Sequence, residues 1–281
     1  MPLPDFLIIG AMKCGTSTLA AQLAAQEGVF VTTPKEPNFF SDDAVYQNGE
    51  AWYEALFVDA APGDRLCEAS THYTKLPTYP NTLARMQALL PAPKLIYVIR
   101  NPIARAVSHF IHDWSEGHMP LSMDEALEEM PELVEYGCYG RQIAPFIEAY
   151  GSDAVHLTSL EEIQQDPVGA FRAIAEFAEL PASARWIVDL PVQNASSDRV
   201  RRLPLQGLLV DNPVARTARH LLVPKSLRNK IRESRTMSER PSFPKARRAE
   251  YEARFLDDRV QLEAVFSGHP ALSLCYPFER S

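Results

Sequence analysis

The stretch FLIIGAMKCGTST at residues 6–18 places a short apolar run directly before a glycine-containing turn. After the turn, apolar side chains recur at helical spacing from Leu19 to Ala24. This order predicts a buried strand, a loop and a helix. Backbone amides and the helix dipole converge at such a helix N-terminus and favour a bound anion. The sequence therefore predicts a phosphate-binding loop over residues 10–18.

The lysine of this loop stands in an unusual place. In the nucleoside-triphosphate version, GxxxxGK[ST], lysine directly follows the second glycine and a hydroxyl side chain reaches magnesium. Here Gly10 and Gly15 keep that spacing, but Thr16 follows the second glycine and the lysine is Lys13. We expect the loop to wrap one phosphate while Lys13 projects toward the group attached beyond it. The residues given this binding role are Lys13, Cys14, Gly15, Thr16, Ser17 and Thr18.

A second strand is predicted at residues 95–99 (LIYVI), which are apolar on both faces, as a central parallel strand requires. Proteins that hydrolyse a nucleoside triphosphate commonly end such a strand with an aspartate that holds magnesium. This strand ends in Arg100, and the helix that follows carries Ser108. A guanidinium and a hydroxyl in these positions predict a clamp for a second, separate phosphate. The implied ligand has two anionic ends, and no metal is expected.

Further strand and helix signals follow along the chain. A third strand is predicted at residues 154–157, a helix after Pro167, and an amphipathic helix after Ser242 with Pro244 in its first turn. Alternating strands and helices are typical of an α/β fold, here a parallel sheet with a phosphate loop and helices on both faces. With 281 residues, 46% of them apolar, we expect a single domain over residues 1–281.

Charge is unevenly distributed along the chain. Between Arg199 and Arg254 there are 15 Lys or Arg against 5 Asp or Glu, a local +10, whereas the remainder carries 13 against 31, or −18. We expect a basic insertion or lid at residues 198–240 within the domain. One hypothesis is a solvated helical face. The other is a surface that meets an anionic ligand, an acidic carrier protein or a membrane surface, with no nucleic acid expected.

Cysteine spacing and hydropathy exclude several classes of protein. The 4 cysteines are scattered, without a CxxC pair or a histidine at metal-ligand spacing. We therefore expect reduced thiols, mostly in the core, and neither a zinc site nor a disulfide framework. No apolar run approaches the roughly 18 residues needed to cross a bilayer, and the N-terminus lacks a signal-peptide pattern. The expected location is cytoplasmic.

Three motifs occur in order along the chain: KCGTST at residues 13–18, KEPNFF at residues 35–40 and YVIRNPIARAVS at residues 97–108. Together they resemble the sulfotransferases that use 3'-phosphoadenosine 5'-phosphosulfate, in particular the heparan-sulfate type and bacterial small-molecule enzymes. The resemblance runs from about Phe6 to Leu180 and resumes at the C-terminal helix. It covers the basic segment poorly.

The resemblance implies which residues bind the donor. The loop from Lys13 to Thr18 would bind the 5'-phosphosulfate, and Arg100 with Ser108 would bind the 3'-phosphate. Tyr139, in the segment GCYG, would lie beside the adenosine.

Two basic residues outside these motifs are expected at the donor as well. Arg240 and Lys245 come just before the final helix, where relatives place basic lid residues. A basic lid would offset the repulsion between an acidic protein and a donor that carries several negative charges.

The general base is expected to be Glu36. Pro37 biases Glu36 toward an extended conformation, so a loop presents the carboxylate. In the family that the chain resembles, the glutamate of the matching Glu-x-x-Phe-Phe pattern removes the proton of the acceptor. His72 is the rival base, and Glu68 is a further acceptor-side candidate. Many heparan-type relatives carry lysine directly after the glutamate that corresponds to Glu68, where this chain has Ala69.

The predicted function is transfer of a sulfuryl group from the donor to a hydroxyl, with an amine as the alternative acceptor. Glu36 would act as base and Lys13 would stabilise the leaving phosphate. The acceptor would be a small molecule, a sugar, a lipid or a carrier-bound group. Two alternatives remain open: a small-molecule kinase with a phosphate loop, and a scaffold that binds adenosine bisphosphate without catalysis. Turnover without magnesium would distinguish the predicted sulfotransferase from such a kinase.

Overall fold

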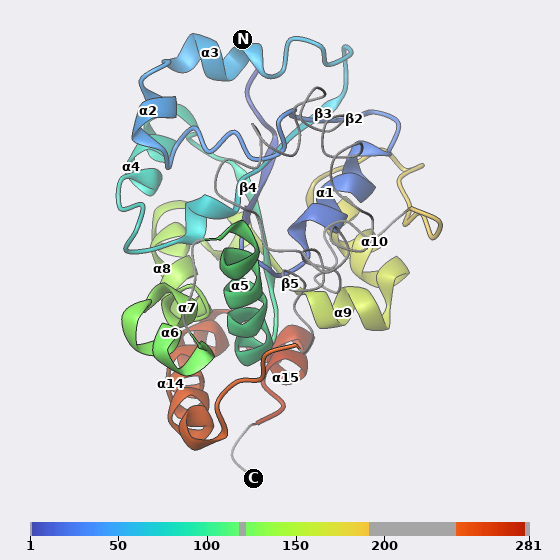
Figure 1. Cartoon of the computed structure of the whole chain (residues 1–281). Coiled ribbons are helices and arrows are strands. Elements are labelled where there is room, and N and C mark those ends of the chain that lie inside the picture. The colour runs from blue at the N-terminus through green and yellow to red at the C-terminus, as the bar shows by residue number, and fades with distance from the viewer. Residues whose placement is uncertain (1, 118–121, 191–239, 279–281) are drawn as a thin grey trace, which may run out of the picture.

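The computed structural model describes residues 2–117, 122–190 and 240–278 (Figure 1). Its centre is a sheet of five parallel strands in the order β2-β3-β1-β4-β5. These strands are β1 (Phe6–Gly10), β2 (Val29–Val31), β3 (Arg65–Ala69), β4 (Lys94–Ile99) and β5 (Val155–Ser159).

Helices cover both faces of the sheet, as the alternation of strands and helices predicts. In Figure 1, α1 (Thr16–Ala24) and α10 (Pro167–Phe177) lie on one side of the sheet, and α4 (Thr82–Leu89) and α8 (Tyr139–Tyr150) lie on the other. The helix α5 (Pro102–Glu116) follows β4 directly. The remaining described elements are α2 (Asp43–Tyr46), α3 (Glu50–Ala55), η1 (Thr71–Thr74), α6 (Met123–Glu129), α7 (Glu132–Glu135), η2 (Ser152–Ala154), α9 (Leu160–Gln165), α14 (Lys245–Val265) and α15 (Pro270–Cys275).

The topology fixes where a ligand can bind. The chain adds β2 and β3 on one side of β1 and then crosses to add β4 and β5 on the other side. In open parallel sheets, ligands bind outside the carboxyl ends of the strands where the direction of winding reverses. Here that point lies between β1 and β4, which is where the phosphate loop and Arg100 emerge.

The strands predicted at 6–9, 95–99 and 154–157 are confirmed, as Phe6–Gly10, Lys94–Ile99 and Val155–Ser159. One detail is corrected. The helix predicted after Ser242 begins at Lys245, so Pro244 precedes its first turn.

The core and the cysteines agree with the composition. Every residue of β1 is buried, as a central parallel strand requires. All four cysteines are free and buried, so the expectation of reduced core thiols is confirmed. In the residues that the structure describes, no helix is both long and apolar enough to cross a membrane. Of the predicted basic insertion at 198–240, all but the last residue lies outside the described ranges.

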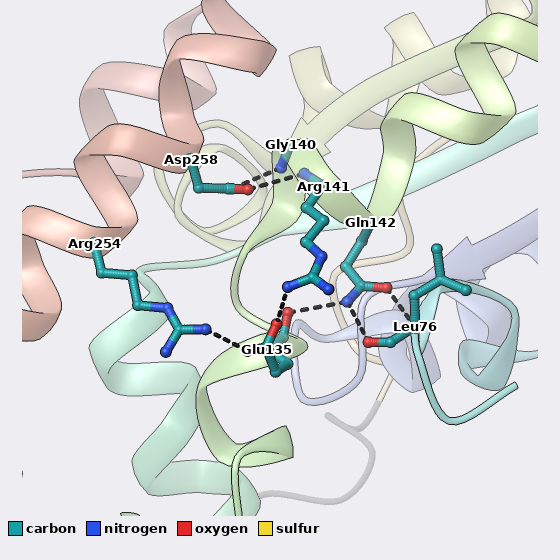
Figure 2. A network of polar contacts seen from close by, with 7 residues as sticks. All are labelled: Leu76, Glu135, Gly140, Arg141, Gln142, Arg254 and Asp258. Atoms are coloured by element: carbon teal, nitrogen blue, oxygen red, sulfur yellow. Dashed lines mark hydrogen bonds and ion pairs between the residues drawn. The ribbon is translucent and has the colours of Figure 1, made fainter. Parts of the chain in front are cut away.

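The helix α14 is joined to the start of α8 by a carboxylate (Figure 2). The two oxygens of Asp258 accept the backbone N–H groups of Gly140 at 2.8 Å and of Arg141 at 2.9 Å. The first N–H groups of a helix have no partner within the helix, and a carboxylate also interacts favourably with its dipole. Glu135 adds a second link, because it accepts from the guanidinium groups of both Arg141 and Arg254. The C-terminal helix thereby fixes the position of α8.

Candidate active site

The loop between β1 and α1 is held in place by contacts with β4 and with α8. The backbone N–H of Ala11 donates to the carbonyl of Val98 on β4 at 2.7 Å. Cys14 is fully buried, and its Sγ lies 3.5 Å from the hydroxyl of Tyr139. The side chain of Cys14 therefore faces the core, which leaves its backbone to face a ligand. Both Lys13 and Gly15 have left-handed backbone, with φ of 68° and 88°.

Arg100 lies against this loop. Its guanidinium donates to the main-chain carbonyl of Lys13 at 3.2 Å, which joins the carboxyl end of β4 to the phosphate loop. Asn101 caps α5 by accepting the N–H of Ala104 at 2.9 Å. Ser108 is buried on α5, and in the described residues no hydrogen bond joins it to Arg100. The structure thus brings Arg100 into contact with the loop, and the role of Ser108 at the 3'-phosphate stays a prediction.

The carboxyl end of β3 is packed against the start of the loop. The hydroxyl of Thr74 in η1 donates to the carbonyl of Ile9 at 2.9 Å. A Cβ at Gly10 would lie only 1.9 Å from that hydroxyl oxygen, so only glycine allows this close approach. As a result, the segment after β3 is a direct neighbour of the phosphate loop.

Glu36 lies in the loop that follows β2, as predicted, and its carboxylate has two partners. It pairs with the ammonium of Lys35 at 2.6 Å and accepts from the hydroxyl of Thr71 at 3.3 Å. Burial alone would raise the pKa of Glu36, but the charge and hydrogen bond of Lys35, together with the charges of Lys75 and His72, lower it below its ordinary value. The carboxylate is therefore ionised at neutral pH, and about a third of the side chain (34%) is exposed.

His72 lies in η1, close enough to Glu36 for each side chain to shift the pKa of the other. Its ring stacks on the ring of Tyr79, with centroids 4.7 Å apart. Burial, with the charge of Lys75, lowers the pKa of His72 to about 4, so the imidazole is neutral at pH 7. Its Nδ1 is buried and has no hydrogen-bond partner among the described residues. A neutral imidazole beside Glu36 keeps both side chains as candidate bases.

Glu68 is a different kind of residue from the acceptor-side candidate that the sequence predicts. It is fully buried in β3, and its carboxylate accepts hydrogen bonds from the hydroxyls of Tyr53 at 2.7 Å and Tyr73 at 2.9 Å. Burial raises the pKa of Glu68 to about 7. Glu68 thus holds two tyrosine side chains through hydrogen bonds. Because none of its surface is exposed, its carboxyl group does not reach an acceptor.

Three predicted donor residues occupy other surroundings. Tyr139 is fully buried and contacts the loop from beneath, so its contact with adenosine stays a prediction. Arg240 and Lys245 are exposed, and among the described residues neither forms a hydrogen bond or ion pair with the loop. Near Lys245, Arg247 pairs with Asp124 and Glu128 of α6. The role of these basic residues as a lid also stays a prediction.

Two residues beside the site are not among those predicted from the sequence. Lys75 follows η1 and is 7% exposed, and Gln142 of α8 hydrogen-bonds both the N–H and the carbonyl of Leu76. Neither belongs to a motif, and the two are joined only because α8 packs beside the segment after β3. His109 is buried between Arg105 and Asp113.

Metal ligands are a separate question. In the described ranges, no group of three or more His, Cys, Asp or Glu side chains is arranged to hold a metal ion. Transfer without a metal stays a prediction.

Comparison with known proteins identifies the family. The family model described as "Sulfotransferase domain" matches residues 3–231. The chain is 27% identical over 187 residues to heparan sulfate glucosamine 3-O-sulfotransferase 3B1 of Mus musculus, and 28% identical over 185 residues to heparan sulfate glucosamine 3-O-sulfotransferase 6 of Homo sapiens. Each match covers 63% of this chain, and 46% and 52% of those proteins, so the chain spans about half the length of these relatives.

A solved structure supports the fold. The sulfotransferase from Alicyclobacillus acidocaldarius superposes with a TM-score of 0.65 at 23% identity, over 94% of this chain and 96% of that one. A parallel sheet whose first strand feeds a phosphate loop, matched by a family model over most of the chain, leads to one conclusion: this chain belongs to the sulfotransferase domain family.

Proposed function

We propose that this chain transfers a sulfuryl group from 3'-phosphoadenosine 5'-phosphosulfate to a hydroxyl of an acceptor and releases adenosine 3',5'-bisphosphate. One observation carries the proposal. An ionised, partly exposed carboxylate, Glu36, follows β2 at the same edge of the sheet where β1 leads into the phosphate loop and β4 ends in Arg100. A base on one side and a cluster of anion-binding groups on the other are what group transfer needs.

The loop residues suit the donor as a substrate. The N-terminus of α1 has no acidic residue in its first turn, so its N–H groups and dipole favour an anion. Arg100, fixed against the loop, supplies a guanidinium for a second phosphate. The loop from Lys13 to Thr18 would bind the 5'-phosphosulfate, with Cys14 contributing through its backbone, and Arg100 with Ser108 would bind the 3'-phosphate.

In the proposed step, the acceptor oxygen forms a bond to sulfur while the bond from sulfur to the phosphate oxygen breaks. Glu36 takes the proton of the acceptor hydroxyl as that bond forms. Lys13 neutralises the negative charge that develops on the leaving phosphate oxygen. Atoms and charge therefore balance with these two side chains and the two substrates.

A hydroxyl is favoured over an amine because the relatives above are named as 3-O-sulfotransferases. The named acceptor of those enzymes is heparan sulfate glucosamine, which supports a sugar or a similar hydroxylated molecule here. Lipid and carrier-bound acceptors, and docking of a carrier protein or membrane surface on the basic segment, stay hypotheses from the sequence.

Labelled donor tests the proposed function. The purified protein is incubated with donor carrying radioactive sulfur, a metabolite extract and a chelator of divalent cations. We expect label to move to an organic acceptor whose mass increases by one sulfur trioxide. Transfer of phosphate from ATP that requires magnesium, with none from the phosphosulfate donor, would instead establish a kinase.

Replacing Lys13 tests its place in the step. We expect Lys13→Ala to lower the rate of sulfuryl transfer by about a hundredfold while donor affinity falls only moderately, because its charge matters most as the leaving phosphate gains charge. Calorimetry and single-turnover rates measure the two effects separately. Equal losses in affinity and rate would show that Lys13 only anchors the donor.

A further inference from the structure

Lys75 is a buried lysine that the proposed step does not use. Its side chain follows η1, and only 7% of the residue is exposed. Among the described residues its ammonium forms no hydrogen bond or ion pair, and it lies over the ring of Tyr136, 5.6 Å from the centroid. Most of the Lys75 side chain is thus buried, while its ammonium has no counter-ion in the described part of the chain. A lysine in this state is available to bind an anionic group of a ligand.

The backbone directly after Lys75 is held by the scaffold (Figure 2). The backbone N–H of the next residue, Leu76, donates to Oε1 of Gln142 at 2.7 Å. The backbone carbonyl of Leu76 accepts a hydrogen bond from Nε2 of the same side chain at 2.8 Å. Gln142 is fully buried and also donates to the carbonyl of Glu135 at 3.0 Å. The network that binds α14 to α8 therefore also sets where the backbone beside Lys75 lies. Such a site is preorganised, which lowers the entropic cost of binding a ligand.

The surroundings of Lys75 connect it with the base. Burial lowers the pKa of Lys75 to about 8, while the charges of Glu36 and Asp113 oppose that change and the charge of Arg105 adds to it. The ammonium is thus mostly charged at pH 7. Aromatic rings lie on this side of the site, since Tyr136 is under the ammonium and His72 stacks on Tyr79.

The topology separates Lys75 from the groups proposed for the donor. The phosphate loop and Arg100 follow β1 and β4, whereas Glu36 follows β2 and Lys75 comes after β3 and η1. The anions of the donor already have the loop amides, Lys13 and Arg100. Lys75 stands on the side where the proton is removed.

We propose that Lys75 is a specificity-determining residue that binds an anionic group of the acceptor. The acceptor would carry a carboxylate, phosphate or sulfate near the hydroxyl that Glu36 deprotonates. This inference rests on the proposed function, because it takes the β2–β3 side of the site as the acceptor side.

Calorimetry with two matched probes tests the inference without turnover. The protein is saturated with adenosine 3',5'-bisphosphate and titrated with 4-hydroxybenzoate and, separately, with 4-hydroxybenzyl alcohol, which has a similar shape but no charge. We expect the wild type to bind the carboxylate about tenfold more tightly or better, the scale of a hydrogen bond to a charged group. If it binds the charged probe no better than the neutral one, the proposal is wrong.

Variants assign the preference to the ammonium. Lys75→Met and Lys75→Gln should lose the preference, and Lys75→Arg should keep it. Arg172→Met is the control: it removes one positive charge from an exposed position on α10, so the preference should remain. Unfolding in urea shows whether each variant is folded. A folded Lys75→Met that keeps the preference would overturn the proposal.

A last comparison separates the acceptor from the donor. If Lys75 instead binds the sulfuryl group, Lys75→Met would weaken the phosphosulfate donor and leave adenosine 3',5'-bisphosphate unaffected, which would contradict the proposal. We expect the two affinities to keep their ratio. Because these readouts are binding constants, absence of sulfuryl transfer would count against the proposed function and not against the role of Lys75.

Discussion

At Glu36, burial and charge act on one carboxyl group in opposite directions. Burial raises its pKa, and the ammonium of Lys35, bonded at 2.6 Å, overcomes that effect together with Lys75 and His72. The carboxylate therefore remains charged in a site where water is partly excluded. A base in this state can take a proton without first losing one, which suits transfer near neutral pH.

Arg100 provides the sharpest prediction at the scale of a residue. We expect Arg100→Ala to weaken adenosine 3',5'-bisphosphate at least tenfold more than adenosine 5'-phosphate, because a charged hydrogen bond to the 3'-phosphate exists only for the first ligand. Loss of the bond to the Lys13 carbonyl would affect both ligands alike. Calorimetry with the two nucleotides measures the difference.

The exposed Arg172 of α10 is the matched control, since Arg172→Ala removes the same charge at a distance from the loop. It should leave both affinities unchanged. If Arg100→Ala weakened the binding of both nucleotides equally, Arg100 would not be the residue that binds the 3'-phosphate.

At the scale of elements, α8 depends on a residue far away in the sequence. The carboxylate of Asp258 in α14 accepts hydrogen bonds from two backbone N–H groups at the start of α8. Glycine is required at position 140 because a Cβ would lie 2.5 Å from the carbonyl oxygen of Asp258. Gln142, in the same turn of α8, fixes the backbone beside Lys75. The C-terminal helix is thus linked through α8 to the acceptor side of the site.

We expect Asp258→Ala to lower the free energy of unfolding by about 2 kcal/mol, because two N–H groups at the start of α8, one of them buried, lose their acceptor. Glu263→Ala on the same helix is the control. That carboxylate is 43% exposed and pairs with Arg259 one turn away, so its loss should cost less than about 0.5 kcal/mol. Urea unfolding measures both values. Equal losses would mean that the link between α14 and α8 adds nothing beyond an exposed ion pair.

The elements that the sequence predicts are those whose signal is local. Continuous apolar runs mark β1 and β4, and a proline in the first turn marks α5 and α10. In contrast, β2 has only three residues, and α8 contains Pro145, which by itself argues against a helix. Its N-terminal partner, Asp258, is 118 residues away from Gly140. No local pattern encodes such a contact.

The same distinction applies to the site. Lys13, Glu36 and Arg100 belong to motifs, and the structure places them at one edge of the sheet. Lys75 belongs to no motif, and its ammonium lies over the ring of Tyr136, which is far from it in the sequence. Glu68 looks like an acceptor-side acid in the sequence, but the position of its side chain in β3 turns it into the core, which the sequence alone does not show.

At the scale of the whole molecule, parallel strands bring segments from distant parts of the sequence to one edge. The phosphate loop, Glu36, Lys75 and Arg100 each follow a different strand. The body around them is acidic, with a net charge of −8 for the chain, while its basic residues gather between Arg199 and Arg254. An anionic donor must therefore be attracted by local basic groups, since the overall charge repels it.

The stability of the whole fold should fall in mild acid, and His156 on β5 contributes to this. Burial, with the charge of His269, lowers the pKa of His156 to about 4 from an ordinary 6.5. Because the unfolded chain takes up the proton first, stability that is present above pH 6.5 is lost as the pH falls toward 4.

We expect the wild type to lose about 1 kcal/mol more than His156→Phe when the pH falls from about 7.5 to about 5.5. His72 and His109, whose pKa values are also lowered to about 4, contribute equally in both proteins. Urea unfolding at the two pH values measures the difference. The same pH dependence in both proteins would show that His156 titrates alike when folded and unfolded.

The proposal that Glu36 is the base facing the phosphate loop is tested most directly by one measurement, the single-turnover rate of sulfuryl transfer by Glu36→Gln with saturating donor. We expect a loss of about a hundredfold or more, the usual scale for a positioned base, with donor affinity unchanged. His72→Ala, measured alongside, should keep most of the rate. An active Glu36→Gln together with an inactive His72→Ala would contradict the account and make His72 the base.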